Sequence, residues 1–256
     1  MKDFVRDLDA LDNLMAFTED STEMPLIQLL DKVEKLYEHF IDISSASHKT
    51  KNFSIAIFGS ARLQPNTPEF QFICDLSQTI VETLGTDIVT GGGPGIMEAA
   101  NQGIMHAVIE QWDNFKQGNR PRSYGMSVRL PYEEEDSPYI HVGKLYKHFA
   151  TRLQSFVSLT QGAYVGAGGI GTLLELSLLW QLKQVNHLPV DFPLIVSPVW
   201  KPILEMFYDM TFSQRENSIP LINSDNMALI QFSDDIEYIV EIFRIAHQKW
   251  QETDCG

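Results

Sequence analysis

The sequence has few cysteines and no long apolar run. Its two cysteines, Cys74 and Cys255, lie far apart without a C-x-x-C pair, so we expect neither a disulfide framework nor a cysteine zinc site. The 7 histidines show no metal-ligand spacing either, and we expect no metal. No stretch approaches the ~18 consecutive apolar residues of a membrane-spanning helix, and the acidic start lacks the apolar run of a signal peptide. These absences predict a cytoplasmic protein with no membrane partner.

Positive charge is also scarce. The chain carries 19 basic and 34 acidic residues, for a net charge of -15. Nucleic-acid binders usually present a basic face, so we expect no nucleic-acid partner. A small phosphorylated ligand remains compatible with this charge, because backbone amides and one or two arginines suffice to hold it.

The chain divides into two parts by pattern, which we place at residues 1–50 and 51–256. At 256 residues it has room for one α/β core and an extension. Within the first 50 residues, apolar side chains recur at helical spacing, which predicts an N-terminal helical extension. They are Leu8, Leu11, Leu14, Met15, Leu26, Leu29, Leu30, Val33 and Leu36. Its role is open: a passive cap over apolar surface, a regulatory element or a dimerising one.

From residue 53 onward, strand patterns alternate with helix patterns. The predicted strands are 54–58, 87–90, 123–130, 139–142, 163–165 and 192–196. The predicted helices are 68–84, 96–109, 145–159, 173–182, 198–212 and 234–251. Such alternation predicts an α/β, Rossmann-like fold, in which right-handed crossovers place helices on both faces of a parallel sheet.

Three of the predicted strands run into loops of small residues. These loops are Gly59-Ser60, Gly91 to Gly95, and Gly166 to Gly171. Ligands of parallel sheets bind outside the carboxyl ends of the strands, so the three loops should border one crevice. The last loop leads directly into a Leu-rich helix, and free N–H groups at a helix start attract phosphate. A nucleotide or sugar-phosphate site is therefore our prediction.

Two other interpretations of the last loop stay open on local pattern alone. Thr172 and Glu175 fit the S/T-x-x-E capping box, in which both side chains only close a helix end. The loop also fits the G-x-G-x-x-G dinucleotide fingerprint. That fingerprint needs an acid at the end of the next strand, whereas Asp191 precedes its strand, so a nicotinamide dinucleotide is disfavoured.

The motifs together resemble the Lonely Guy family of cytokinin riboside 5′-monophosphate phosphoribohydrolases. This family includes nucleoside-5′-monophosphate nucleosidases and was long labelled "possible lysine decarboxylase". The similarity covers roughly residues 53–197 and rests on four pieces. They are Phe58 to Arg62, Thr90 to Asn101, Gly125 to Pro131, and Gly168 to Glu175 preceded by Arg152. The resemblance implies hydrolysis of an AMP-like nucleoside 5′-monophosphate to free base and ribose 5-phosphate, without a cofactor, by a homodimer.

The resemblance also suggests roles for individual residues. Glu175 and Arg152 would be catalytic, with Glu175 stabilising an oxocarbenium-like transition state and Arg152 holding phosphate or base. Glu175 lies three residues after Thr172, on the same helix face, so both can engage one ribose phosphate. Candidate substrate contacts are Gly59, Ser60, Gly92, Gly93, Gly95, Met97, Gly168, Gly169, Gly171 and Thr172, with Glu134 from the acidic run 133–136. Tyr146, His148 and Phe149 are candidates for a base pocket or for the core.

Three positions depart from the family pattern. Ala167 replaces a proline, Leu153 replaces a lysine after the arginine, and Gln181 replaces a threonine. These changes keep open an alternative, a nucleotide-binding or sensing protein without turnover. The older decarboxylase label would require pyridoxal phosphate on a lysine, and none of the strand-end loops carries one.

Overall fold

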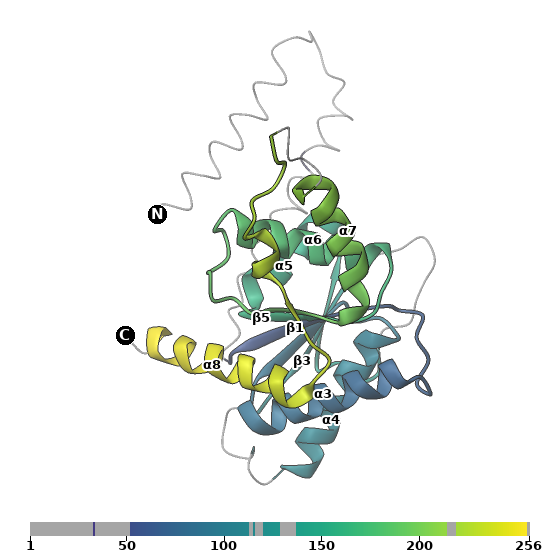
Figure 1. The fold of residues 1–256 in the computed structure, drawn as a ribbon. Coiled ribbons are helices and arrows are strands. Elements are labelled where there is room, and N and C mark those ends of the chain that lie inside the picture. The colour runs from purple at the N-terminus through teal and green to yellow at the C-terminus, as the bar shows by residue number, and fades with distance from the viewer. Residues whose placement is uncertain are drawn as a thin grey trace. The chain divides into compact units, whose positions relative to one another are not determined.

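The computed structural model describes residues 52–112, 115, 120–128, 137–213 and 219–254, together with Val33. The proposed extension at residues 1–50 therefore lies almost entirely outside the described residues, as does the acidic run with Glu134. Within the described part, the chain forms a seven-stranded parallel sheet with α-helices on both faces (Figure 1). The α/β, Rossmann-like prediction is confirmed.

The sheet has the strand order β4-β3-β2-β1-β5-β6-β7. Its strands are β1 (Ser54–Phe58), β2 (Asp87–Thr90), β3 (Ser123–Val128), β4 (Val142–Tyr146), β5 (Gly162–Val165), β6 (Leu194–Val196) and β7 (Gln231–Phe232). The order reverses beside β1, because β2 lies on one side of it and β5 on the other. In open parallel sheets, such a reversal marks the place where ligands bind.

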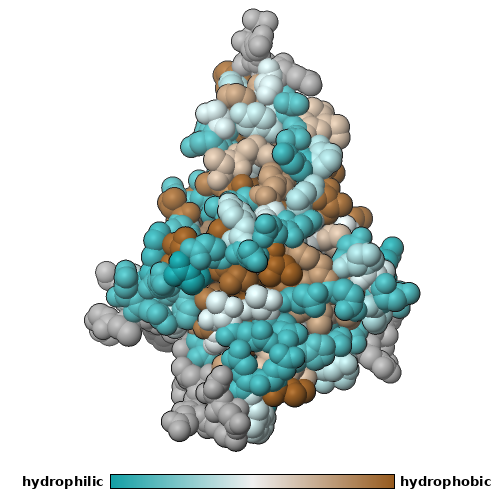
Figure 2. Space-filling model, turned by 60° about the horizontal axis from the view of Figure 1, so that its bottom comes forward, coloured by the Kyte–Doolittle hydropathy of each residue, from teal (hydrophilic) through white to brown (hydrophobic). Residues whose placement is uncertain are grey.

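Among the described residues, six α-helices cover the sheet, three on each face. They are α3 (Pro68–Leu84), α4 (Ile96–Glu110), α5 (Phe149–Leu159), α6 (Ile170–Gln184), α7 (Lys201–Thr211) and α8 (Ile236–Asp254). Alternate residues of β1 separate the two cores: Ile55 and Ile57 pack with α3, α4 and α8, whereas Ala56 and Phe58 pack with α5, α6 and α7. Figure 2 looks toward the first of these faces, where hydrophilic side chains predominate around a central group of apolar ones.

Helix α3 shows how local sequence sets the boundaries of an element. The Thr67 side chain accepts a hydrogen bond from the Phe70 N–H, and Pro68 occupies the first turn, where its missing N–H costs nothing. Gly85 ends the helix with φ +64°, a left-handed conformation that favours glycine. The predicted boundaries of α3 are confirmed. No helix among the described residues is both long and apolar enough to cross a membrane.

Two predicted elements are wrong in position. The strand predicted at 139–142 instead spans Val142–Tyr146, and the helix predicted from Leu145 begins at Phe149. The fourth strand pairs with β3 from Tyr124↔Val142 to Val128↔Tyr146, and this register draws Leu145 and Tyr146 into the sheet. Because β4 is an edge strand with mostly exposed side chains, its sequence lacks the apolar run of a buried strand.

The helix predicted at 198–212 is divided. A 3-10 turn, η1 (Pro198–Trp200), precedes α7, and Pro202 lies in the first turn of α7. Proline has no N–H to donate to the carbonyl four residues earlier, so a continuous α-helix loses a bond at this point. The Lys201 N–H bonds to the Pro198 carbonyl instead.

Candidate active site

The three glycine loops lie side by side, because they follow the neighbouring strands β2, β1 and β5. The backbone of Ser60 joins them. Its N–H donates to the Ala167 carbonyl at 2.9 Å, and its carbonyl accepts from the Ile96 N–H at 2.9 Å. The first loop is thus bonded both to the last loop and to the start of α4. The predicted convergence of the loops is confirmed, whereas their binding of a ligand stays a prediction.

Arg152 and Glu175 form a buried ion pair. Arg152 projects from α5 and Glu175 from α6, and Arg152 Nη1 lies 3.7 Å from Glu175 Oε1. Each residue is only 9% exposed. The Arg152 Nε also donates to the Met126 carbonyl at 2.6 Å, which fixes the guanidinium at the end of β3.

The same guanidinium packs against the second glycine loop. A Cβ at Gly91 would lie 2.3 Å from Arg152 Nη2 and 2.6 Å from Met97 Sδ, so only glycine leaves room for both side chains. Arg152 Cζ also lies 5.3 Å from the centre of the Phe156 ring and 5.8 Å from that of Phe149. Arg152 therefore links α5, α6, β3 and the second loop.

Burial changes the acid–base properties of this pair. Removal from water raises the pKa of Glu175 from 4.5 to about 7, while the nearby Arg152 acts in the opposite direction. Burial also lowers the pKa of Arg152, and Glu175 opposes that change. A carboxyl group that titrates near neutral pH can hold or release a proton under physiological conditions.

The start of α6 is open. Gly169 occupies the N-cap position, and no side chain caps the helix. The first N–H groups of a helix have no partner within it, and Gly168, Gly169, Ile170 and Gly171 are all exposed. Thr172 is buried and packs against Gly168, where a Cβ would meet Thr172 Oγ1 at 2.1 Å.

This geometry contradicts the capping-box interpretation. That motif would make Thr172 the N-cap and turn the Glu175 side chain back onto the helix start. Instead the helix begins two residues before Thr172, and Glu175 faces Arg152 on a different helix. Glu175 is thus left available to act on something other than its own helix end.

Several of the candidate glycines have a structural reason for their identity. A Cβ at Gly59 would lie 2.4 Å from Ile96 Cγ2, so this glycine allows α4 to pack against β1. Gly92 and Gly95 have φ angles of +81° and +70°, which residues with a Cβ rarely adopt. Gly93 is half-buried within the same loop. Any contact of these glycines with a ligand would come in addition to these structural roles.

The three aromatic candidates for the base pocket differ in their burial. Tyr146 is fully buried in the core with α5, α6 and α7. His148 is exposed at the N-cap position of α5, and the Phe149 ring is 48% exposed. Only Phe149 both reaches the surface and lies beside Arg152.

Two residues that support the site were not predicted from the sequence. Trp200 Nε1 donates to the Gly166 carbonyl at 2.8 Å, and the Met126 carbonyl anchors Arg152. Neither has a local signal, because a backbone acceptor can belong to any residue. The spacing of Phe149, Arg152 and Phe156 along one helix face was the only available indication of ring contacts to Arg152.

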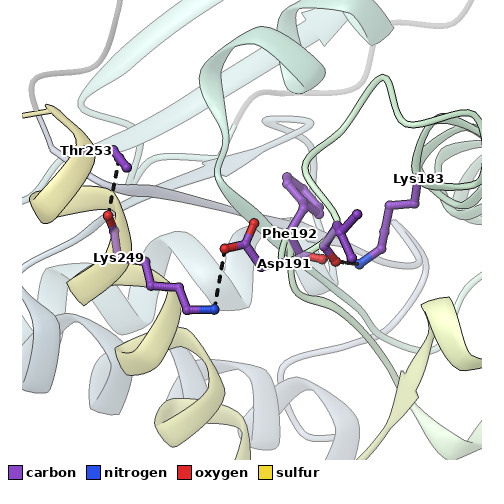
Figure 3. Close-up of polar contacts among 6 residues, drawn as sticks. Lys183, Asp191, Phe192, Lys249 and Thr253 are labelled. Carbon is purple, nitrogen blue, oxygen red and sulfur yellow. Dashed lines mark hydrogen bonds and ion pairs between the residues drawn. The ribbon is translucent and has the colours of Figure 1, made fainter.

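Lys183, the one buried lysine of the described residues, lies at the far end of α6 from the glycine loops. Its Nζ donates to the Val190 carbonyl at 3.3 Å and to the Phe192 carbonyl (Figure 3). Beside it, Asp191 pairs with Lys249 at 3.5 Å. Lys183 thus fastens the segment before β6 and does not serve as the lysine of a cofactor site at the loops. Among the described residues, no three His, Cys, Asp or Glu side chains gather into a metal site.

One solved structure among those compared agrees with this architecture. The molybdenum cofactor binding protein of the phototrophic bacterium Rippkaea orientalis is 17% identical with a TM-score of 0.52, over 77% of this chain and 98% of that one. The Moco carrier protein of Chlamydomonas reinhardtii is 16% identical with a TM-score of 0.49, over 78% and 99%. No curated protein matches the chain.

A family model described as "Possible lysine decarboxylase" matches residues 97–243, from the first turn of α4 to the middle of α8. The matched segment contains Arg152, Glu175 and the open start of α6. It spans more than half of the chain, and the protein therefore belongs to the possible lysine decarboxylase family, the group of the Lonely Guy proteins.

Proposed function

We propose that the protein hydrolyses the N-glycosidic bond of a nucleoside 5′-monophosphate, giving free base and ribose 5-phosphate. The observation that carries this proposal is the buried Arg152–Glu175 pair, 3.7 Å apart, one helical turn beyond the open start of α6. An anion-attracting helix end and a carboxyl group are thus presented by a single helix. This is the combination that a ribose phosphate with a scissile bond at C1′ requires.

The phosphate would be held at the helix start. The backbone amides of the exposed residues Gly168, Gly169 and Gly171 and the Thr172 hydroxyl would supply hydrogen-bond donors, and the helix dipole favours the negative charge. Glycines here let the phosphate approach the backbone, because a Cβ at Gly169 or Gly171 would project into open space.

The reaction adds one water across the C1′–N bond. As that bond breaks, positive charge develops on the ribose ring, and the Glu175 carboxylate stabilises it and orients the attacking water. The bonding electrons leave with the base, which takes up a proton, while the water loses one on attacking C1′. Arg152 stays charged throughout, holds Glu175 in place and offsets charge on the phosphate.

The test is release of free base from a panel of nucleoside monophosphates, measured by chromatography with purified protein. Glu175→Gln preserves the shape of the side chain but removes its charge, and we expect turnover to fall by ~10²–10³ or more. Glu175→Ala should abolish base release while the fold survives. Glu241→Gln, which removes an exposed carboxylate on α8, should retain full activity. Wild-type turnover in the Glu175 variants would show that the carboxyl group has no catalytic role.

A nucleotide-binding protein without turnover is the second candidate. Ala167 and Leu153 depart from the family pattern beside the site, and two neighbours in fold are described as binding or carrier proteins. This alternative predicts saturable binding of a nucleoside monophosphate with no release of base. Reverting Leu153→Lys and Ala167→Pro would then create activity that the natural chain lacks.

A further inference from the structure

A pocket opens on the opposite side of the last glycine loop from Glu175. Its volume is about 200 Å³, and it lies where β5 and β6 end, beside the first turns of α3 and the residues just before α8. Its lining side chains Ile73, Ile96 and Tyr164 belong to the core of the α3, α4 and α8 face. Arg152 and Glu175 do not line it, and their neighbour Phe156 belongs to the core of the other face. The pocket is therefore separate from the candidate active site, although both adjoin the loop at Gly166 and Ala167.

The polar end of this pocket is a carboxylate held by two hydroxyl groups. Tyr164 Oη donates to Asp234 Oδ1 at 2.6 Å, and Ser197 Oγ donates to Asp234 Oδ2 at 3.1 Å. Each carboxylate oxygen can accept more than one hydrogen bond, so Asp234 retains acceptor capacity. Asp234 is exposed, whereas Tyr164 and Ser197 are buried, which places the carboxylate at the mouth of the pocket.

The charge of the lining is of one sign. Among the described residues that line the pocket, Asp234 and Glu69 are acidic and none is basic. Burial, with Asp234 beside it, raises the pKa of Tyr164, so this hydroxyl stays neutral at physiological pH. The two carboxylates would repel an anionic ligand, while a cation would find an oriented carboxylate.

The rest of the lining is apolar and aromatic. The rings of Phe72 and Tyr164 have centroids 6.0 Å apart and are tilted by 47°, and Ile73 and Ile96 form the adjoining wall. Aromatic faces attract an ammonium group as well as an apolar body. A dry cavity of about 150 Å³ admits benzene, so the volume here suits one six-membered ring with a short arm.

We propose that this pocket binds a small organic cation, in which an ammonium group pairs with Asp234 and a ring-sized apolar body packs against Phe72 and Ile96. The ligand class follows from the acidic mouth, the apolar wall and the volume. It does not depend on the proposed hydrolysis, because neither Arg152 nor Glu175 takes part.

The experiment uses the full chain and three probes that share one ring: benzylamine, benzyl alcohol and phenylacetate. Binding is measured by ligand-observed NMR titration at pH 7. We expect saturable binding of benzylamine, at least tenfold weaker binding of benzyl alcohol, and none of phenylacetate. Equal binding of amine and alcohol, preference for phenylacetate, or no binding of benzylamine would overturn the proposal.

Two variants and one control substitution test the location of the site. Asp234→Asn should weaken benzylamine binding at least tenfold, because the amide lacks the charge but can still accept a hydrogen bond from Tyr164. Glu237→Gln removes one negative charge from the nearby first turn of α8 and should leave binding unchanged. Phe72→Leu provides a second variant in the apolar wall and should weaken binding of both benzylamine and benzyl alcohol. Unchanged benzylamine affinity in a folded Asp234→Asn protein, verified by circular dichroism, would refute the assignment.

Discussion

Rising pH should destabilise this protein through Glu175, and replacement by glutamine should remove the effect. Burial raises the pKa of Glu175 from 4.5 to about 7 in the folded protein. In the unfolded chain the group titrates near its ordinary value. Between about pH 4.5 and 7 the unfolded chain therefore loses a proton that the folded protein keeps, so the free energy of unfolding falls as pH rises.

The size of the effect follows from the same two values. The interval between 4.5 and about 7, at about 1.4 kcal/mol for each factor of ten, amounts to about 3 kcal/mol. This contribution is fully present below about pH 4.5, declines with increasing pH, and is lost above about pH 7. Because glutamine resembles the neutral acid, the stability of Glu175→Gln relative to wild type should increase by about 3 kcal/mol from pH 4.5 to pH 8.

The assay is urea unfolding of both proteins at half-unit steps from pH 4.5 to 8, followed by tryptophan fluorescence and circular dichroism. Glu241→Gln serves as the control, because Glu241 is exposed and its pKa is lowered by Arg244. The stability of this control relative to wild type should not increase between pH 4.5 and pH 8. Parallel curves for wild type and Glu175→Gln would refute the reasoning, since they would mean that the buried carboxyl group titrates as it does in water.

Three other outcomes follow from the same geometry. Arg152→Met removes the cation that favours ionised Glu175. Because a carboxyl group with a pKa of about 7 can take up a proton instead, this loss should cost up to about 1.4 kcal/mol at pH 8 and less at pH 5, as urea unfolding would show. Gly171→Ala should stabilise α6 by about 0.5–1 kcal/mol while weakening nucleotide affinity in calorimetry, and unchanged affinity would place the phosphate elsewhere. Trp200→Phe removes the bond to the Gly166 carbonyl and should cost about 1 kcal/mol or more in thermal unfolding.

The central strands of the fold could be predicted from the sequence because they are buried on both faces. Ser54–Phe58 and Asp87–Thr90 are short segments with an apolar centre, each followed by a glycine, and both were predicted with the observed boundaries. The edge strands of the sheet could not be predicted in this way. Val142–Tyr146 was misplaced, and Gln231–Phe232 is too short to show any periodicity. Pairing with a neighbour defines these strands, and a single-sequence pattern does not contain that neighbour.

The candidate site could likewise be predicted only in part from the sequence. The glycine loops and Glu175 could be singled out from the sequence motifs, and Arg152 from the resemblance to the Lonely Guy family. The bond from Arg152 to the Met126 carbonyl and the support of Gly166 by Trp200 could not, because both use backbone oxygen atoms. The sequence also left the capping box open, and the start of α6 at Ile170 together with the position of Glu175 beside Arg152 of α5 decided against it.

The double connection at Ser60 has a consequence for how this region tolerates change. Both of its bonds to the neighbouring segments are made by main-chain atoms, so most side chains at position 60 would preserve them. Proline is the exception, since it lacks the hydrogen that reaches Ala167. The first and last glycine loops and the start of α4 are thus coupled by the peptide framework itself, which leaves the exposed side chains around them free to diverge without loosening the assembly.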